Sequence, residues 1–309
     1  MNEQPTYIVF DLEWNQCPYG KDRENSRLPF EIIDIGAVAL NEKKEIIGHY
    51  HQFIKPVVYK KLHFRTREVI GIDRKELDKG AHFPHAVIEF FKFCGEDPIF
   101  CTWGDQDLLE LQRNLQYYGM LSRLPGPLRY ADVQKLFAIT FETRKTRRSL
   151  EYAADFLGFQ KDSTFHRAYD DALYTAAVLK EIPDETIRNE LSLDSFQNPK
   201  SRDEEILIRR KGYEKFISME YASRDEALRD PVATRLHCPV CGRNIKRILR
   251  WTPAGHRNYV ALGLCGEHGY ADGRIHLRKA DEDRLYVERV VQSANDETAE
   301  KILGKFRKQ

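Results

Sequence analysis

Acidic side chains occur at two places in the sequence in patterns that suit the binding of a divalent cation. Asp11 and Glu13 are separated by one residue at the end of an apolar run, so in a strand both side chains point to one face. Two carboxylates on one face repel each other unless a cation lies between them. Asp107 falls in the first turn of a predicted helix, where the helix dipole favours an anion. Surface acids also produce such patterns by chance, so each pattern alone is a weak indication of a metal site.

A histidine and a further acid occur together where the last helix of the predicted α/β unit begins. His166 and Asp171 are five residues apart, a spacing that does not share a helical face. The two side chains can meet if His166 lies in the loop that leads into the helix and Asp171 lies on the helix. Asp105 is an alternative to Asp107 as a ligand, and Asp170 is an alternative to Asp171.

Four cysteine and histidine residues farther along the chain are spaced like the ligands of a structural zinc ion. The first pair has the form C-P-V-C-G at 238–242, and the second has the form C-G-E-H-G at 265–269. Paired C-x2-C and C-x2-H sequences at this separation indicate a tetrahedral Zn²⁺ site. The predicted ligands are Cys238, Cys241, Cys265 and His268. His237 and His256 are less favoured as the fourth ligand, and a chance cluster of three free thiols is the other alternative.

The elements that must position these residues are those of a mixed α/β sheet flanked by helices. Apolar and β-branched runs predict strands, and apolar spacing of three to four residues predicts helices. The predicted strands cover 5–16, 31–41, 45–55 and 98–103, with another leading into 131–132. The predicted helices cover parts of 64–95, then 105–118, 147–157 and 168–182.

Several of these segments carry motifs that follow one another in a recognisable order. They are FDLEW at 10–14, EIIDIGAV at 31–38, WGDQD at 103–107, SLEYAADFLGF at 149–159 and HRAYDD at 166–171. This order resembles the DEDDh family of 3′-to-5′ exonucleases, which have a ribonuclease-H-like fold. Within that family it is most similar to the branch that contains the sporulation-kinase-pathway inhibitor and histone-mRNA-type exonucleases. The resemblance covers about residues 5–182.

The resemblance implies a catalytic set and two divalent ions, Mg²⁺ or Mn²⁺. The family's spacing selects Asp171 over its neighbour. Asp11 is expected to bridge both ions, Glu13 and Asp171 to hold the ion that generates hydroxide, and Asp107 to support the other ion through water. Oxygen ligands suit these hard cations. His166 is expected to act as general base on the attacking water, because an imidazole pKa of about 6.5 suits that task near neutral pH.

The substrate implied by the resemblance is a single-stranded RNA or DNA 3′ end, with RNA favoured, and the products are 5′-mononucleotides. Leu12, Trp14 and Arg148 are the candidate substrate contacts. Trp14 follows the strand-end acids and can stack on a terminal base, although core packing explains it equally well. Arg148 ends a basic run that can contact phosphates or form a solvated loop.

Composition limits the other classes of protein. The hydrophobic fraction of 41% supports a buried core, and the net charge of +1 excludes a uniformly basic protein. No apolar stretch approaches the roughly 18–20 residues of a membrane helix, and the start lacks a signal peptide, so we expect a cytoplasmic protein without a membrane partner. Charge is nevertheless uneven, because residues 231–280 carry nine Lys and Arg against two acids. This segment suits a polyanion or is a solvated basic face.

These observations predict four segments and a leading function. The segments are an exonuclease domain over 1–182, a charged helical connector over 183–230, a basic zinc ribbon over 231–280 and a helical tail over 281–309. The leading hypothesis is a metal-dependent 3′-to-5′ exonuclease whose zinc ribbon helps to bind nucleic acid. The alternatives are a regulatory protein that uses the nuclease fold as a docking scaffold and a proofreading partner of a polymerase.

Overall fold

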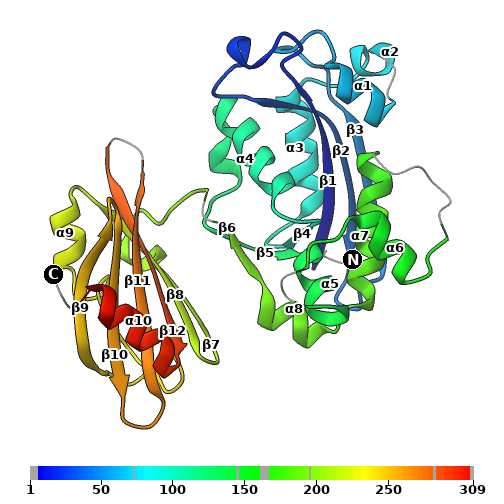
Figure 1. Ribbon diagram of the computed structural model, residues 1–309. Coiled ribbons are helices and arrows are strands. Elements are labelled where there is room, and N and C mark those ends of the chain that lie inside the picture. The colour runs from blue at the N-terminus through cyan, green and yellow to red at the C-terminus, as the bar shows by residue number, and fades with distance from the viewer. Residues whose placement is uncertain are drawn as a thin grey trace. The chain divides into compact units, whose positions relative to one another are not determined.

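The computed structural model describes residues 6–71, 74–143, 146–160, 167–194, 196–280 and 283–306. The chain divides into two compact units, and we call Met1–Phe196 unit 1 and Gln197–Gln309 unit 2 (Figure 1). Each unit contains a six-stranded sheet of its own. Across the described residues, no helix combines the length and the apolar character that crossing a bilayer requires.

The sheet of unit 1 has the strand order β3-β2-β1-β4-β5-β6. The first three strands pair antiparallel, β1, β4 and β5 pair parallel, and β6 returns antiparallel beside β5. The parallel pairs need crossover connections, and helices supply them. The strands are β1 (Tyr7–Gln16), β2 (Phe30–Leu40), β3 (Ile46–Phe53), β4 (Ile99–Thr102), β5 (Leu128–Asp132) and β6 (Ser192–Asp194).

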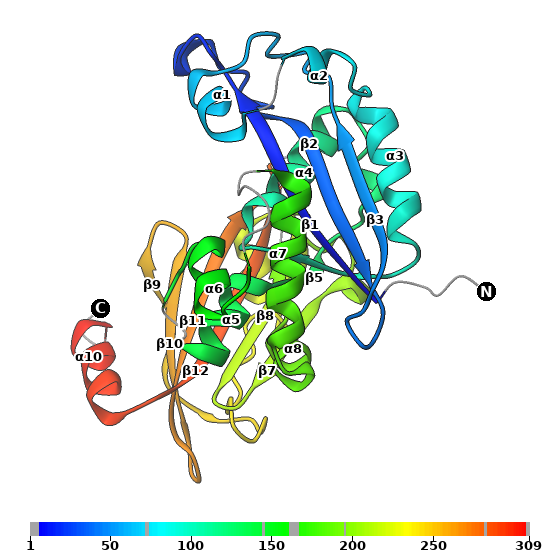
Figure 2. The ribbon, with the colours of Figure 1, turned by 90° about the vertical axis from the view of Figure 1, so that its right-hand side faces the viewer.

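Helices cover both faces of this sheet, and the alternation of side chains along β1 shows which face each helix covers. Ile8 and Phe10 pack with α3 and α4, whereas Val9 packs with α5, α6 and α7. Figure 2 shows α7 lying across β1 and β2. The helices are α1 (Phe64–Ile70), α2 (Arg74–Asp78), α3 (Phe83–Cys94), α4 (Gln106–Tyr117), α5 (Val133–Phe141), α6 (Leu150–Phe156), α7 (Ala168–Glu181) and α8 (Asp184–Glu190).

Unit 2 is an antiparallel sheet with the order β7-β8-β12-β11-β10-β9. Two helices supply apolar side chains to separate parts of its core: Ala227 of α9 packs with Ile275 and Val287, and Ile302 of α10 packs with Val260. The elements are β7 (Ile206–Arg210), β8 (Tyr213–Tyr221), α9 (Arg224–Arg229), β9 (Lys246–Gly255), β10 (Asn258–Cys265), β11 (Gly269–Lys279), β12 (Leu285–Ala294) and α10 (Asp296–Phe306).

The predicted division of the chain after residue 182 is wrong. The segment 183–230 is not a helical connector, because α8 and β6 complete unit 1 while β7 and β8 belong to the sheet of unit 2. Likewise, 231–280 is not a separate small ribbon, and the tail adds β12 as well as the predicted helix. The reason is that the missed strands pair with distant partners: β8 pairs with β12 and not with a sequence neighbour alone.

Candidate functional site

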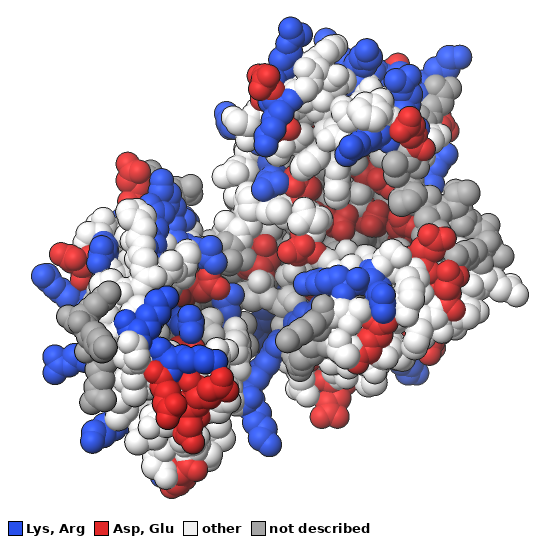
Figure 3. Space-filling view, viewed as in Figure 1, with Lys and Arg blue, Asp and Glu red and all other residues white. Residues whose placement is uncertain are grey.

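Three of the predicted acids come together on unit 1, on the face of the sheet that α7 covers. Asp11 and Glu13 lie on β1, and Asp171 lies in the first turn of α7. One carboxylate oxygen from each of the three lies within 4.8 Å of the others. Figure 3 shows acidic side chains gathered in a hollow on the visible face of this unit. An all-oxygen donor set of this kind suits a hard divalent cation.

A glycine on the neighbouring strand allows α7 to approach the acids. Gly36 on β2 is directly opposite Asp11 on β1. A Cβ atom at this position would lie 2.1 Å from the backbone nitrogen of Tyr169, at the start of α7. Only a residue without a side chain permits this contact, so Gly36 allows Asp171 to lie beside the acids of β1.

Asp107 lies beside the three acids at the start of α4 and is 6% exposed. Its Oδ1 accepts a hydrogen bond of 3.1 Å from the backbone N–H of Leu12. Burial raises the pKa of Asp107 to about 7, and the charge of Asp171 adds to the effect. Asp105 is the exposed N-cap residue of α4. Asp107 is thus the buried acid of the pair 105 and 107, and Asp171, unlike Asp170, belongs to the group with Asp11 and Glu13.

The electrostatics of the site show an excess of negative charge. Burial raises the pKa of Glu13 to about 8, and the charges of Asp171 and Asp107 contribute. Burial also raises the pKa of Asp11 well above its usual value, together with the charges of Asp107 and Asp171. A bound cation would relieve both effects, since it offsets the repulsion and favours the ionised carboxylates. The residues present thus fit divalent ions.

Three further residues lie near the acidic site and were not predicted from the sequence: Asp34, His51 and Arg167. Asp34 on β2 is paired in register with Glu13, and its Oδ1 lies 3.0 Å from Nε2 of His51 on β3. Burial raises the pKa of both Glu13 and Asp34, and the positive charge of Arg167, the N-cap residue of α7, offsets a part of that rise. Asp34 is the one charged residue in the apolar run 32–40, and this was the available signal.

The predicted substrate contacts lie in different environments. The side chain of Leu12 is 3% exposed and packs in the core, so its contribution to the site is its backbone N–H. Trp14 is half-buried with its ring 5.8 Å from that of Phe30. Arg148 is neutralised by Glu142, 3.0 Å from its Nε. The predicted general base, His166, lies outside the described residues.

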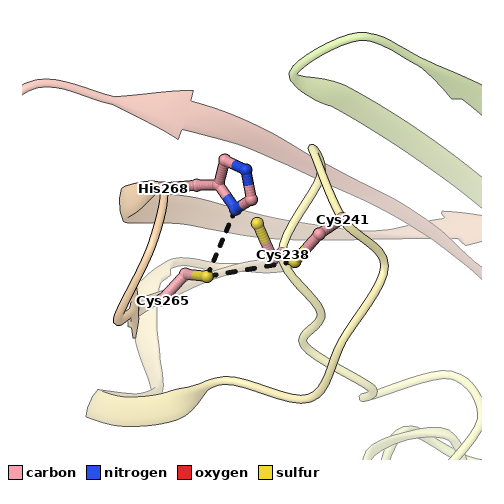
Figure 4. Close-up of side chains that lie close together, drawn as sticks. All are labelled: Cys238, Cys241, Cys265 and His268. Atoms are coloured by element: carbon pink, nitrogen blue, oxygen red, sulfur yellow. Dashed lines mark hydrogen bonds between the residues drawn. The ribbon is translucent and has the colours of Figure 1, made fainter.

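The predicted zinc ligands come together in unit 2 (Figure 4). The Sγ atoms of Cys241 and Cys265 are 3.9 Å apart, and Sγ of Cys265 is 3.6 Å from Nδ1 of His268. A tetrahedral Zn²⁺ site with ordinary bond lengths separates two sulfurs by about 3.8 Å and a sulfur from a nitrogen by about 3.6 Å. The fourth member of the cluster is Cys238, and neither His237 nor His256 belongs to it.

Hydrogen bonds lower the pKa of two of the cysteines, Cys241 and Cys265. The backbone N–H and guanidinium of Arg243 lower the pKa of Cys241 to about 6. The backbone N–H of Glu267 lowers the pKa of Cys265. The side chains of Arg243 and Glu267 also form an ion pair between the two ligand-bearing turns. Because the thiolate is the form that binds metal, these contacts favour a closed structural zinc site.

Comparisons with known proteins agree with the geometry of unit 1. Residues 8–179 match the family model RNase_T, described as "Exonuclease". The "Probable 3'-5' exonuclease KapD" of Bacillus subtilis (strain 168) is 26% identical over 174 residues, which cover 56% of this chain and 82% of the relative. The solved nuclease domain of 3'hExo, a DEDDh family member bound to rAMP, is 20% identical with a TM-score of 0.51. That likeness covers 63% of this chain and 98% of the solved one, and it confirms the predicted ribonuclease-H-like fold.

Proposed function

The chain belongs to the RNase_T exonuclease family, and from this premise we propose that it removes 5′-mononucleotides one at a time from single-stranded 3′ ends. The 3′-to-5′ direction agrees with the name of the Bacillus relative, a probable 3'-5' exonuclease. The observation that carries the proposal is the group formed by Asp11, Glu13 and Asp171, whose carboxylate oxygens lie within 4.8 Å of one another.

The residues of the site have complementary roles in this proposal. Asp11, Glu13 and Asp171 hold divalent ions, and Asp107 lies beside them. Bound Mg²⁺ or Mn²⁺ supplies Lewis acidity at the phosphate and makes water acidic enough to attack it near neutral pH. His166, positioned by the motif in the lead-in to α7, accepts the proton of that water. The positive charge of Arg167 acts on the carboxylate of Glu13. Arg167 would therefore also attract the phosphate that is cleaved.

We favour RNA as the substrate, because the branch of the family that the motifs resemble contains histone-mRNA-type exonucleases. Unit 2 helps to bind the nucleic acid in this proposal, since the segment 231–280 carries nine Lys and Arg against two acids. Zinc held by Cys238, Cys241, Cys265 and His268 would fix the two turns at one end of its sheet and take no part in the reaction.

The direct test is digestion of 5′-labelled RNA and DNA oligonucleotides, single- and double-stranded, with Mg²⁺, Mn²⁺ or EDTA. We expect single-stranded RNA to give a ladder of products shortened from the 3′ end, and EDTA to abolish it. Asp171→Asn should reduce the rate at least about 10²-fold, since it removes a metal ligand from the reacting centre.

The matched control is Asp170→Asn, which changes the same chemical group one residue away without removing a member of the acidic group. It should keep most of the activity. Equal activity of wild type and Asp171→Asn would contradict the catalytic assignment. If the wild-type chain with Mn²⁺ degrades none of the oligonucleotides, the exonuclease proposal fails and the docking-scaffold alternative gains support.

A further inference from the structure

A basic pocket lies in unit 2 at the end of the sheet opposite the cysteine cluster. Its walls come from the β9–β10 turn, the end of β11, residues 283–285 at the start of β12 and the start of α9. Figure 1 shows α9 at one end of the sheet and the β10–β11 turn at the other. Strand β10 joins the two ends, running from Asn258 beside the pocket to Cys265 at the cluster, a length of about 24 Å for a strand of this size.

Among the described residues, four cations and one carboxylate line the pocket. The cations are Arg224, Arg257, Lys279 and Arg284, and the carboxylate is that of Asp283. All four come from different elements or turns, so only the folded sheet brings them together. The cavity has a volume of about 310 Å³, which is at the small end of the range for ligand sites.

The contacts of these cations show which of them are available to a ligand. Arg284 is held by Glu220, whose Oε2 lies 3.2 Å from its Nε. Arg224 lies over the ring of Tyr259, 5.1 Å from its centroid. Arg257 and Lys279, by contrast, form no ion pair with any carboxylate in the described part of the chain. Two of the cations are thus held by other groups, and the other two line the cavity without an ion pair to any described residue.

Two apolar side chains also line the pocket. They are Leu277, which is buried, and Leu285. Apolar neighbours strengthen the attraction between an anion and the surrounding cations, because the local dielectric constant is lower than that of water. Several cations that approach from different elements suit a phosphate group better than a carboxylate side chain, since Arg and Lys side chains from several directions can contact its oxygens together.

We propose that this pocket binds the phosphodiester backbone of a single-stranded nucleic acid, at a site separate from the acidic centre of unit 1. The inference deepens the proposed function and rests on it for the class of ligand. It locates substrate binding at the end of unit 2 away from the zinc cluster, so Arg257 and Lys279 contact the substrate while the cysteines serve only the fold. The contacts are to phosphates, so binding depends little on base sequence.

The test measures binding without cleavage, using the full chain with Asp11→Asn and a fluorescent single-stranded oligouridylate. Dissociation constants from fluorescence anisotropy are compared, over a series of KCl concentrations, with and without the pair Arg257→Gln and Lys279→Gln. Each phosphate contact to a single strand contributes about 0.7 to the slope of log affinity against log salt, so the pair should lower the slope by about 1.4. At physiological salt this corresponds to roughly tenfold weaker binding. The same change is expected for single-stranded DNA of equal length.

The control pair is Lys246→Gln with Arg250→Gln, which removes the same charge from exposed positions of β9. We expect the control pair to lower the slope by much less than the pocket pair, and both pairs to keep the melting temperature and zinc content of the parent. An unchanged slope in the pocket pair, or an equal change in the control pair, would overturn the proposal. So would loss of affinity for AMP without loss for the oligonucleotide, because the pocket would then hold free nucleotide.

The two proposals fail in different ways. A chain that binds through the pocket and cleaves nothing contradicts the exonuclease function alone. A chain that cleaves RNA and whose pocket pair binds like the parent contradicts the pocket alone.

Discussion

Asp11, Glu13 and Asp171 concentrate negative charge in one small region between β1 and α7. Neighbouring Asp107 and Asp34 add to it, and Arg167 offsets a part. Such a cluster is costly for the fold unless the acids take up protons or bind cations. The stability of unit 1 and its metal affinity are therefore linked to pH through the same side chains.

Metal-free protein should lose stability as the pH rises from about 4 to about 8. The pKa of Glu13 rises from its usual 4.5 to about 8 in the folded chain, and that of Asp107 from 3.8 to about 7. The folded state thus binds these protons more tightly than the unfolded chain. The protons contribute their full stability only below the pKa values of the unfolded chain. This contribution is lost as the pH rises through the pKa values of the folded state. Denaturant unfolding in EDTA should show a loss on the order of a few kcal/mol.

Two comparisons make the cause specific. Saturating Mn²⁺ should remove the loss, because the ion favours the ionised carboxylates. Glu13→Gln should flatten the metal-free profile, since it removes one of the groups whose pKa burial raises. A metal-free wild type whose stability stays constant or increases across this range would contradict the described burial of the acids.

Most residues of the acidic site could be predicted from the sequence, but its surroundings could not. Spacing on a strand places Asp11 and Glu13 on one face whatever the tertiary structure, and the following strands and helices carry recognisable motifs. Asp34 stands out as the one charged residue of the apolar run 32–40, but its contact with His51 arises only from the pairing of β2 with β3. The position of His166 relative to the acids stays a prediction.

At the scale of elements, the fit between α7 and the sheet decides whether the acids meet. The first turn of α7 brings Asp171 to β1, and Gly36 provides the space for it. Sequence patterns predicted β1, β2 and α7, because their apolar runs are long and their ends are marked. They missed α5 over 133–141, although Val133, Leu136 and Phe137 are spaced as on one face of a helix.

Gly36→Ala should disrupt the acidic site although it adds only one methyl group. The new Cβ would meet backbone atoms of Tyr169 and Ala168, which cannot move as a flexible side chain can. We expect destabilisation of about 1–3 kcal/mol from overpacking. A displacement of Asp171 by about 1 Å would lower the exonuclease rate on the order of 10²-fold.

Gly304→Ala is the matched control, because a Cβ at this position of α10 meets no atom within 4 Å. It should leave the exonuclease rate unchanged and keep or slightly raise the melting temperature, since alanine favours a helix. Wild-type rate and Mn²⁺ affinity in Gly36→Ala would show that α7 does not depend on this contact.

At the scale of the molecule, the chain consists of two units with separate hydrophobic cores. The sheet of unit 2 could not be predicted from the sequence, and the reason is physical. Its strands β7 and β8 contain many charged residues, and the partner of β8 lies about 70 residues later in β12. Local periodicity detects amphipathic segments but not long-range pairing, so the zinc motif was seen and the sheet that carries it was not.

The larger core changes what loss of zinc should do. For a small isolated ribbon, Cys238→Ser would unfold residues 231–280, because the metal supplies most of the folding free energy. In the sheet of unit 2, the effect should be a lower unfolding temperature for unit 2 and loss of bound zinc, with β8, β11 and β12 still paired below it. Differential scanning calorimetry should show two unfolding transitions. The transition of unit 2 should shift to lower temperature, and that of unit 1 should stay unchanged.

Cys94→Ser changes a cysteine buried in the core of unit 1 and is the reciprocal control. It should shift the other transition and keep the zinc content. A variant Cys238→Ser with wild-type zinc content would contradict the ligand assignment, and one in which both transitions shift equally would contradict the independence of the two cores.

The order of strands in unit 2 also has a consequence for biosynthesis. Unit 1 consists of residues that leave the ribosome first, and all of its strands are complete by Asp194. In unit 2, β8 is translated early, whereas β12, which pairs with it, is the last strand to be translated. The β7–β8 hairpin therefore cannot pair with the rest of the sheet until most of the unit has been synthesised. Nascent chains stalled before residue 285 would expose the apolar positions of β8, including Phe216 and Ile217, and would be the natural clients of a ribosome-associated chaperone.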